Sequence, residues 1–117
     1  TRYWSKKSFK KGVKKIKNKI TQISLISKKY NSEFYLVIYP WGETLVHGQG
    51  SFNWENFAQE LCMQDKCILI NTFPEFRNKK NNDRFWYSNL YFIGDEHLNS
   101  KGNLFLAEIL GKKIFSK

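Results

Sequence analysis

Two titratable side chains near the end of the chain, Asp95 and His97, have the residue types and the spacing of an acid–base pair. They flank Glu96 in the segment GDEHLNS, and His97 is one of only two histidines in the chain. In an extended backbone, residues i and i+2 project to the same side, so the Asp95 carboxylate can accept the Nδ1 proton of His97, while Glu96 points away. That contact leaves Nε2 of His97 as a general base, which would activate the hydroxyl of a nucleophile such as serine.

The elements that must position this pair alternate between helix and strand. Residues 9–30 predict an amphipathic helix, because apolar residues recur every three or four positions and lysines fill many of the others. Near-continuous apolar runs at 34–39 and 67–71 predict strands that are buried on both faces, as in a parallel sheet. This order predicts an α/β fold, a three-layer sandwich around a parallel sheet.

Two asparagines mark the starts of further helices. Asn53 is expected to cap a helix over 54–62, and Asn99 is expected to cap the final helix. Gly102 falls in the first turn of that last helix, where a missing side chain permits close packing. The polar and glycine-rich stretches between these elements, residues 42–53 and 77–85, are expected to be loops.

The positive charge of the chain is confined to its first part. The formal net charge is +10, yet residues 1–30 hold eleven basic residues and no acid, and residues 31–117 hold nine basic and ten acidic residues. A basic lead-in at 1–8 and the lysine-rich helix can attract nucleic acid or an anionic membrane, with Tyr3, Trp4 and Phe9 adding stacking or insertion. The alternative to an enzyme is therefore a non-catalytic binding module. A solvated helix face is the simpler explanation of the lysines.

The two cysteines, Cys62 and Cys67, are separated by four residues. This is not the spacing of a zinc knuckle or of a thioredoxin-type motif, and no second Cys or His pair completes a tetrahedral site. A local disulfide would suit an oxidising compartment, and two free thiols also fit the sequence. A metal site built from His47, His97 and Asp95 is not demanded by their spacing.

The segment GDEHLNSKGNLFLAEIL, residues 94–110, resembles the last block of the SGNH (GDSL-type) hydrolases and O-acyltransferases, where an Asp and a His precede the final helix. FYLVIYPWGETL and CILINTFPEF also resemble late strands of that family and the turns after them. The resemblance implies that residues 1–117 form the C-terminal half of one SGNH- or flavodoxin-like domain. Asp95 would orient His97 as the base, and their short spacing resembles the branch that acts in O-acetylation of extracellular carbohydrates.

The resemblance also implies a part that this sequence lacks. The family's nucleophilic serine lies in a Gly-Asp-Ser motif, which does not occur here, and Ser5 and Ser8 have no nucleophile-elbow context. The serine is therefore expected from an N-terminal half of the same fold or from a partner chain. The expected substrate is an acylated small molecule or carbohydrate, with Trp41 and His47 lining the cleft.

The resemblance implies an acyl-serine ester hydrolase or O-acetyltransferase that uses no cofactor and no metal, and an extracytoplasmic or membrane-associated place is favoured. No apolar run approaches the roughly 20 residues that a membrane-spanning helix needs.

Overall fold

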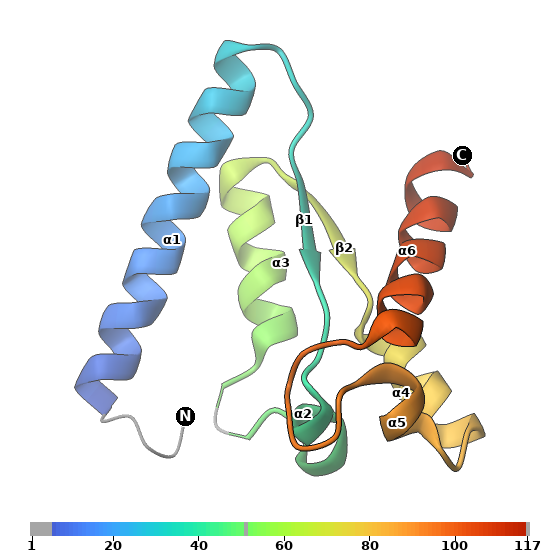
Figure 1. Ribbon diagram of the computed structural model, residues 1–117. Helices are drawn as coiled ribbons and strands as arrows, with labels where there is room; N and C mark the ends of the chain where they lie inside the picture. Colours follow the sequence, from blue (N-terminus) through green and yellow to red (C-terminus); the bar gives the residue numbers. More distant parts are fainter. Residues whose placement is uncertain (1–5, 51, 117) are drawn as a thin grey trace.

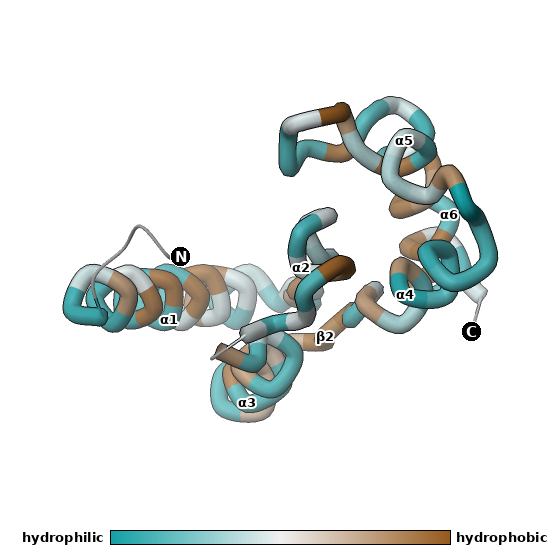
Figure 2. The backbone as a smooth tube through the Cα atoms, turned by 90° about the horizontal axis from the view of Figure 1, so that it is seen from below, coloured by the Kyte–Doolittle hydropathy of each residue, from teal (hydrophilic) through white to brown (hydrophobic). Residues whose placement is uncertain are grey.

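The computed structural model describes residues 6–50 and 52–116, which are mostly helical (Figure 1). The elements follow in the order α1 (Lys6–Lys29), β1 (Tyr35–Ile38), α2 (Gly42–His47), α3 (Trp54–Asp65), β2 (Ile68–Asn71), α4 (Phe73–Asn82), α5 (Trp86–Leu90) and α6 (Ser100–Phe115). The helices α1 and α3 lie on one side of the strand pair, and α4, α5 and α6 lie on the other (Figures 1 and 2).

The two strands pair in parallel, as the apolar runs predicted. Tyr35 is paired with Ile68 at one end and Ile38 with Asn71 at the other. The ladder continues past the last pair, because the backbone and the hydroxyl of Thr72 both donate to the Ile38 carbonyl, at 3.1 and 2.7 Å. The helices α2 and α3 connect the two parallel strands, as the alternating order of elements predicted.

The prediction of a three-layer α/β sandwich of the SGNH or flavodoxin-like kind is wrong for the described residues. The sheet there consists of β1 and β2 alone, with four residues each, and helices account for most of the chain. A three-layer sandwich needs a sheet broad enough to receive helices on both faces, and two short strands do not supply that surface. The residues of β1 are accordingly only half-buried, although their sequence is apolar throughout.

Two stretches that were expected to be loops are helical instead. Residues 42–47 form α2, which buries Leu45, and the polar run after Phe76 completes α4. In α4 a proline at the first turn, Pro74, favours a helical start, and Phe73 and Phe76 are buried on one side. Burial of a few aromatic and aliphatic side chains thus outweighs the weak helix propensity of the asparagines that follow.

The main apolar core lies beside the strands rather than over them. Its buried members come from α2, α4, α5, α6 and the segment between the last two helices: Leu45, Phe76, Leu90, Tyr91, Leu98 and Ile109. The predicted N-caps of α3 and α6 are confirmed. The Asn53 side chain accepts a hydrogen bond from the Asn56 amide, and the Asn99 side chain accepts one from the Gly102 amide, each at 2.9 Å.

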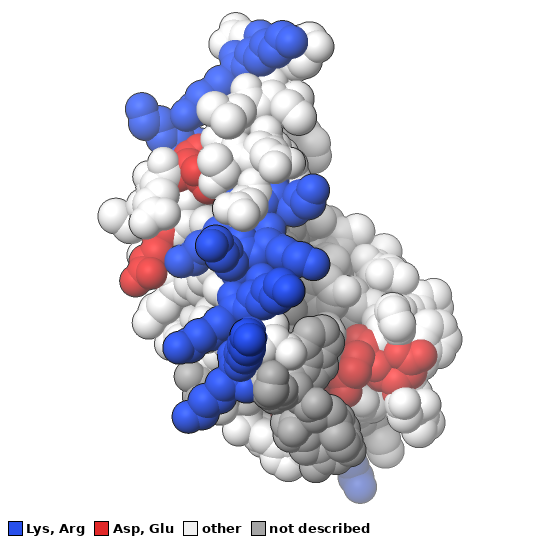
Figure 3. All heavy atoms as spheres, turned by 90° about the vertical axis from the view of Figure 1, so that its left-hand side faces the viewer, with Lys and Arg blue, Asp and Glu red and all other residues white. Residues whose placement is uncertain are grey.

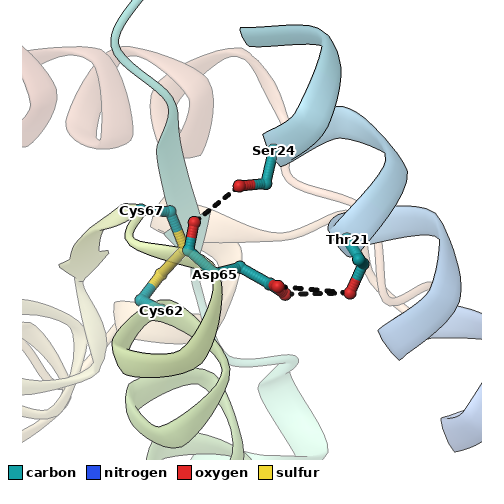
Figure 4. The surroundings of a disulfide bond; sticks show 5 residues. All are labelled: Thr21, Ser24, Cys62, Asp65 and Cys67. Atoms are coloured by element: carbon teal, nitrogen blue, oxygen red, sulfur yellow. Dashed lines mark hydrogen bonds between the residues drawn. A yellow bond between two sulfur atoms is a disulfide. The ribbon is translucent and has the colours of Figure 1, made fainter. Parts of the chain in front are cut away.

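A disulfide joins Cys62 and Cys67 and closes the turn between α3 and β2, which settles the open question between bridge and free thiols (Figure 4). Asp65 lies inside this closed turn and holds α1. Its carbonyl accepts a hydrogen bond from the Ser24 hydroxyl at 2.5 Å, and its carboxylate accepts one from Thr21 at 3.1 Å. The bridge therefore fixes the loop on which the long first helix is anchored.

The basic lead-in that was expected at residues 1–8 falls only partly within the described residues. Residues 6–8 are part of α1, whereas residues 1–5, with Tyr3 and Trp4, lie outside the described residues. Among the described helices, none combines the length and apolar character that crossing a membrane requires, as expected.

Replacing Gly102 by alanine should strongly destabilise the fold. A Cβ at this position would collide with the backbone of Leu90, whose carbonyl carbon would lie 2.8 Å away. Because backbone yields less easily than a side chain, we expect Gly102→Ala to lower the free energy of unfolding by about 3 kcal/mol. In Gly111→Ala, on the same helix, the new Cβ meets nothing within 4 Å. In this control variant the free energy of unfolding should rise by about 0.5–1 kcal/mol. Equal urea midpoints for the two variants would contradict this packing.

Removal of the disulfide should lower the free energy of unfolding by less than Gly102→Ala does. The cysteines are five positions apart, and closing so short a loop stabilises the native state by about 2 kcal/mol in the chain-entropy description. Cys62→Ala/Cys67→Ala should therefore lower the free energy of unfolding by about that amount in urea titrations. Addition of a reductant should bring the unmodified chain to a similar value and leave the double variant unchanged. A reductant effect on the double variant would refute the assignment.

Candidate active site

The segment between α5 and α6 is a narrow loop that returns to its starting point. Tyr91 and Leu98 form an isolated antiparallel bridge at its base. The Phe92 amide donates to the His97 carbonyl at 3.1 Å, and the Asp95 amide donates back to the Phe92 carbonyl at 3.1 Å. Gly94 takes a positive φ of 76°, which permits this tight turn. The loop thus holds Asp95 and His97 at its exposed end.

Asn99 closes the base of this loop with both ends of its amide side chain. Its Oδ1 accepts the Gly102 amide and caps α6, while its Nδ2 donates to the carbonyl oxygens of Ser88 at 2.7 Å and Tyr91 at 3.0 Å. The Asn99 backbone amide donates to the Leu90 carbonyl at 2.9 Å. The sequence indicated the cap alone; the contacts across the loop depend on which carbonyls the fold brings to this side chain.

Asp95 and His97 are in contact, as predicted, but the backbone at 95–97 bends and is not extended as the prediction assumed. Asp95 Oδ1 lies 2.5 Å from His97 Nδ1 and also accepts the His97 backbone amide at 2.9 Å. An ionised carboxylate only accepts hydrogen bonds, so Nδ1 is the protonated nitrogen of the neutral ring and Nε2 carries the lone pair. The arrangement has the orientation that a general base requires; a catalytic role for the pair stays a prediction.

The environment of the pair is open. The side chain of His97 is 83% exposed and that of Asp95 is 51% exposed, in contrast to the buried aspartate of a Ser-His-Asp triad. The hydrogen bond from the His97 side chain, followed by that from its backbone amide, lowers the pKa of Asp95 below the ordinary value. Solvent screens this interaction, so its contribution to stability is small.

Two hollows on the surface lie away from the pair. A hollow of about 310 Å³ lies between α4 and α6, and one of about 470 Å³ lies along α3 and β2. Neither is lined by Asp95 or His97. The His97 side chain is exposed, which leaves the ring open to water.

Two tyrosines attach the loop to the turn after β1. The buried Tyr91 hydroxyl donates to the Pro40 carbonyl at 2.5 Å, and the Tyr87 ring lies against Gly42 at the start of α2. The Tyr87 hydroxyl also donates to the Asp95 carbonyl at 3.4 Å. The pair consequently lies near the carboxyl ends of the strands, where functional groups collect in α/β folds (Figure 1).

These tyrosines were not selected as site residues from the sequence. Burial raises the pKa of Tyr91, and the Glu96 carboxylate adds to the effect, so its phenol remains a donor. Burial also raises the pKa of Tyr87, with Glu96 as the next contribution. The aromatic run WYSNLY before the motif was the only signal of this support.

Trp41 and His47 were predicted to line a substrate cleft. Trp41 directly precedes α2, His47 is the last residue of α2, and both are exposed. No hydrogen bond or ring contact among the described residues joins either of them to Asp95 or His97. They lie at the same end of the strand pair, since Tyr87 contacts α2 at Gly42. Their role in substrate binding stays a prediction.

The alternative of a metal site receives no support. Within residues 6–50 and 52–116, no group of three or more His, Cys, Asp or Glu side chains is arranged to hold a metal ion. His47, His97 and Asp95 therefore do not form the ligand set that was considered.

Comparison of the chain with protein families, with curated proteins and with solved structures gave no match. The geometry of the loop therefore carries the functional argument.

The Asp95–His97 contact should be visible in a carboxyl titration by NMR. We expect the pKa of Asp95 to lie below its ordinary value and to rise in His97→Ala, while His47→Ala leaves it unchanged. A depressed pKa in the folded state stabilises at pH values above the unfolded pKa, and this stabilisation is lost as the pH falls through the folded pKa. An Asp95 pKa that is indifferent to His97→Ala would contradict the contact.

Proposed function

We propose that this chain contributes the Asp–His pair of a serine-dependent ester hydrolase or carbohydrate O-acetyltransferase. Asp95 would orient the imidazole, and His97 would act as the base toward a serine supplied from outside these 117 residues. The observation that carries the proposal is the contact between Asp95 Oδ1 and His97 Nδ1, which leaves Nε2 free and exposed. The resemblance of residues 94–110 to the SGNH hydrolases points to the same chemistry.

The proposed reaction moves one proton and one acyl group. His97 Nε2 takes the proton of the serine hydroxyl as its oxygen attacks the ester carbonyl, and then gives this proton to the departing alkoxide. Water, or a sugar hydroxyl in a transferase, next attacks the acyl-serine after losing its proton to the same nitrogen. Asp95 stays ionised throughout and stabilises the imidazolium that forms at each step.

The described residues argue for an external nucleophile. Ser88 and Ser100 are the serines closest to the motif in sequence. Ser88 donates its hydroxyl to the Phe85 carbonyl, and neither serine is hydrogen-bonded to His97. Without a serine, turnover falls by a factor on the order of 10⁶ in enzymes of this type. The isolated chain should therefore be nearly inactive.

The exposure of the pair favours the same conclusion. A triad operates in a water-excluded site, where fixed dipoles stabilise developing charge far better than solvent does. An His97 ring that is 83% exposed leaves room for a segment that carries the serine and covers the imidazole. Trp41, beside this end of the strand pair, offers a ring face on which a sugar would stack.

The test uses the native protein together with whatever segment or partner chain supplies the serine. It is assayed for hydrolysis of p-nitrophenyl acetate and for labelling by a fluorophosphonate, which reacts with activated serines. His97→Ala should abolish labelling and lower turnover by at least about 10⁴-fold, because it removes the proton acceptor. Asp95→Asn should lower turnover by a smaller factor, because it leaves the imidazole in place as the proton acceptor. His47→Ala is the matched control and should retain serine labelling.

Two outcomes would refute the proposal. The first is full turnover by His97→Ala, which would remove the imidazole from the reaction. The second is robust turnover by the 117-residue chain alone that depends on His97, which would show that the nucleophile lies within it.

A further inference from the structure

We propose that α1 binds the surface of an anionic phospholipid bilayer through one of its sides. Six exposed residues follow one another at steps of three or four and so lie on one side, here called the outer stripe. Five belong to α1 and the last directly follows it: Lys11, Lys15, Lys19, Ile23, Ile26 and Tyr30. Its first half is basic and its second half is apolar. This binding is independent of the Asp95–His97 chemistry.

The apolar half of the outer stripe is open to solvent. Ile23, Ile26 and Tyr30 are 46%, 57% and 69% exposed. Figure 1 shows why, because the last turns of α1 stand beyond the ends of α3 and β1. Three large apolar side chains on one protruding helix end form a surface that gains free energy on entering a lipid interface.

The charge of α1 is also uncompensated. The helix carries ten lysines and no acid, all ten are exposed, and no ion pair among the described residues involves any of them. Figure 3 shows these lysines running along the length of the helix. Anionic lipid head groups complement this charge, and long lysine stems can reach them while neighbouring apolar side chains enter the interface.

The fold already uses the opposite side of α1. Ile20 and Ser24 are buried, the Ser24 hydroxyl donates to the Asp65 carbonyl, and Phe9 packs against Phe52 at a centroid distance of 5.1 Å. These contacts fix the direction in which the outer stripe faces. A helix of 24 residues is about 36 Å long, so the outer stripe offers an extended surface without any unfolding.

The residue types favour lipid over the other polyanions and over a second copy. Every charge on α1 is a lysine, whereas nucleic-acid recognition draws on the planar guanidinium of arginine. Phosphate contacts would also leave Ile23 and Ile26 in water. Pairing of two copies through this side would bring together two helices with ten lysines each, which repel one another.

The experiment measures sedimentation of the 117-residue chain with vesicles. One set is pure phosphatidylcholine, and the other is an equimolar mixture with phosphatidylglycerol. Binding should be confined to the mixed vesicles and should weaken with salt. Lys11, Lys15 and Lys19 changed together to Gln should lower the partition coefficient roughly 100-fold. Ile23→Gln/Ile26→Gln should lower it at least about tenfold.

Matched variants control for net charge and folding. The same loss of three charges through Lys80, Lys101 and Lys112 changed to Gln should affect binding much less, and urea unfolding checks that every variant is folded. Failure to bind mixed vesicles, or an equal loss in the control trio, would overturn the proposal. Binding that survives Ile23→Gln/Ile26→Gln and is matched by an RNA duplex would assign the lysines to nucleic acid instead. A dimer that the isoleucine pair abolishes would assign the outer stripe to self-association.

Discussion

The amide side chain of Asn99 is the constraint on which the candidate site depends. Its Oδ1 accepts a hydrogen bond from the Gly102 amide and so caps α6. Its Nδ2 donates to the carbonyl oxygens of Ser88 and Tyr91, which lie before the loop. Gly102 makes this possible, because any side chain there would strike the Leu90 backbone and push α6 away from α5. The position of His97 therefore follows from contacts at the base of its loop, since its own ring is almost fully in water.

The Asp95–His97 pair differs from a working Ser-His-Asp triad in its exposure to solvent. The distance between Asp95 and His97 is short, but the carboxylate is half in solvent, and solvent weakens the coupling that a buried aspartate exerts. Pre-organisation of the pair and exclusion of water are separate requirements. The loop meets the first requirement through its turn and its tyrosine contacts, whereas the exposed His97 side chain does not meet the second.

The molecule divides into two packing regions with different means of stabilisation. Around α5 and α6 a compact apolar core holds the loop through Leu90, Tyr91 and Leu98. Around α1 and α3 fewer large residues are buried. There the two helices are held together by the disulfide-closed turn with Asp65 and by contacts among aromatic rings. The disulfide thus adds a covalent constraint in the region where fewer large side chains are buried.

The sequence by itself determined the parts of the structure that depend on local patterns. The apolar runs identified both strands, asparagine at two helix starts identified both caps, and the i, i+2 spacing placed Asp95 against His97, because each of these follows from a few neighbouring residues. The overall architecture and the helical state of residues 42–47 and 73–82 were decided by tertiary structure. There, burial of Leu45, Phe73 and Phe76 overrode local propensity, and the number of strands that meet in space set the layers, which no short pattern specifies.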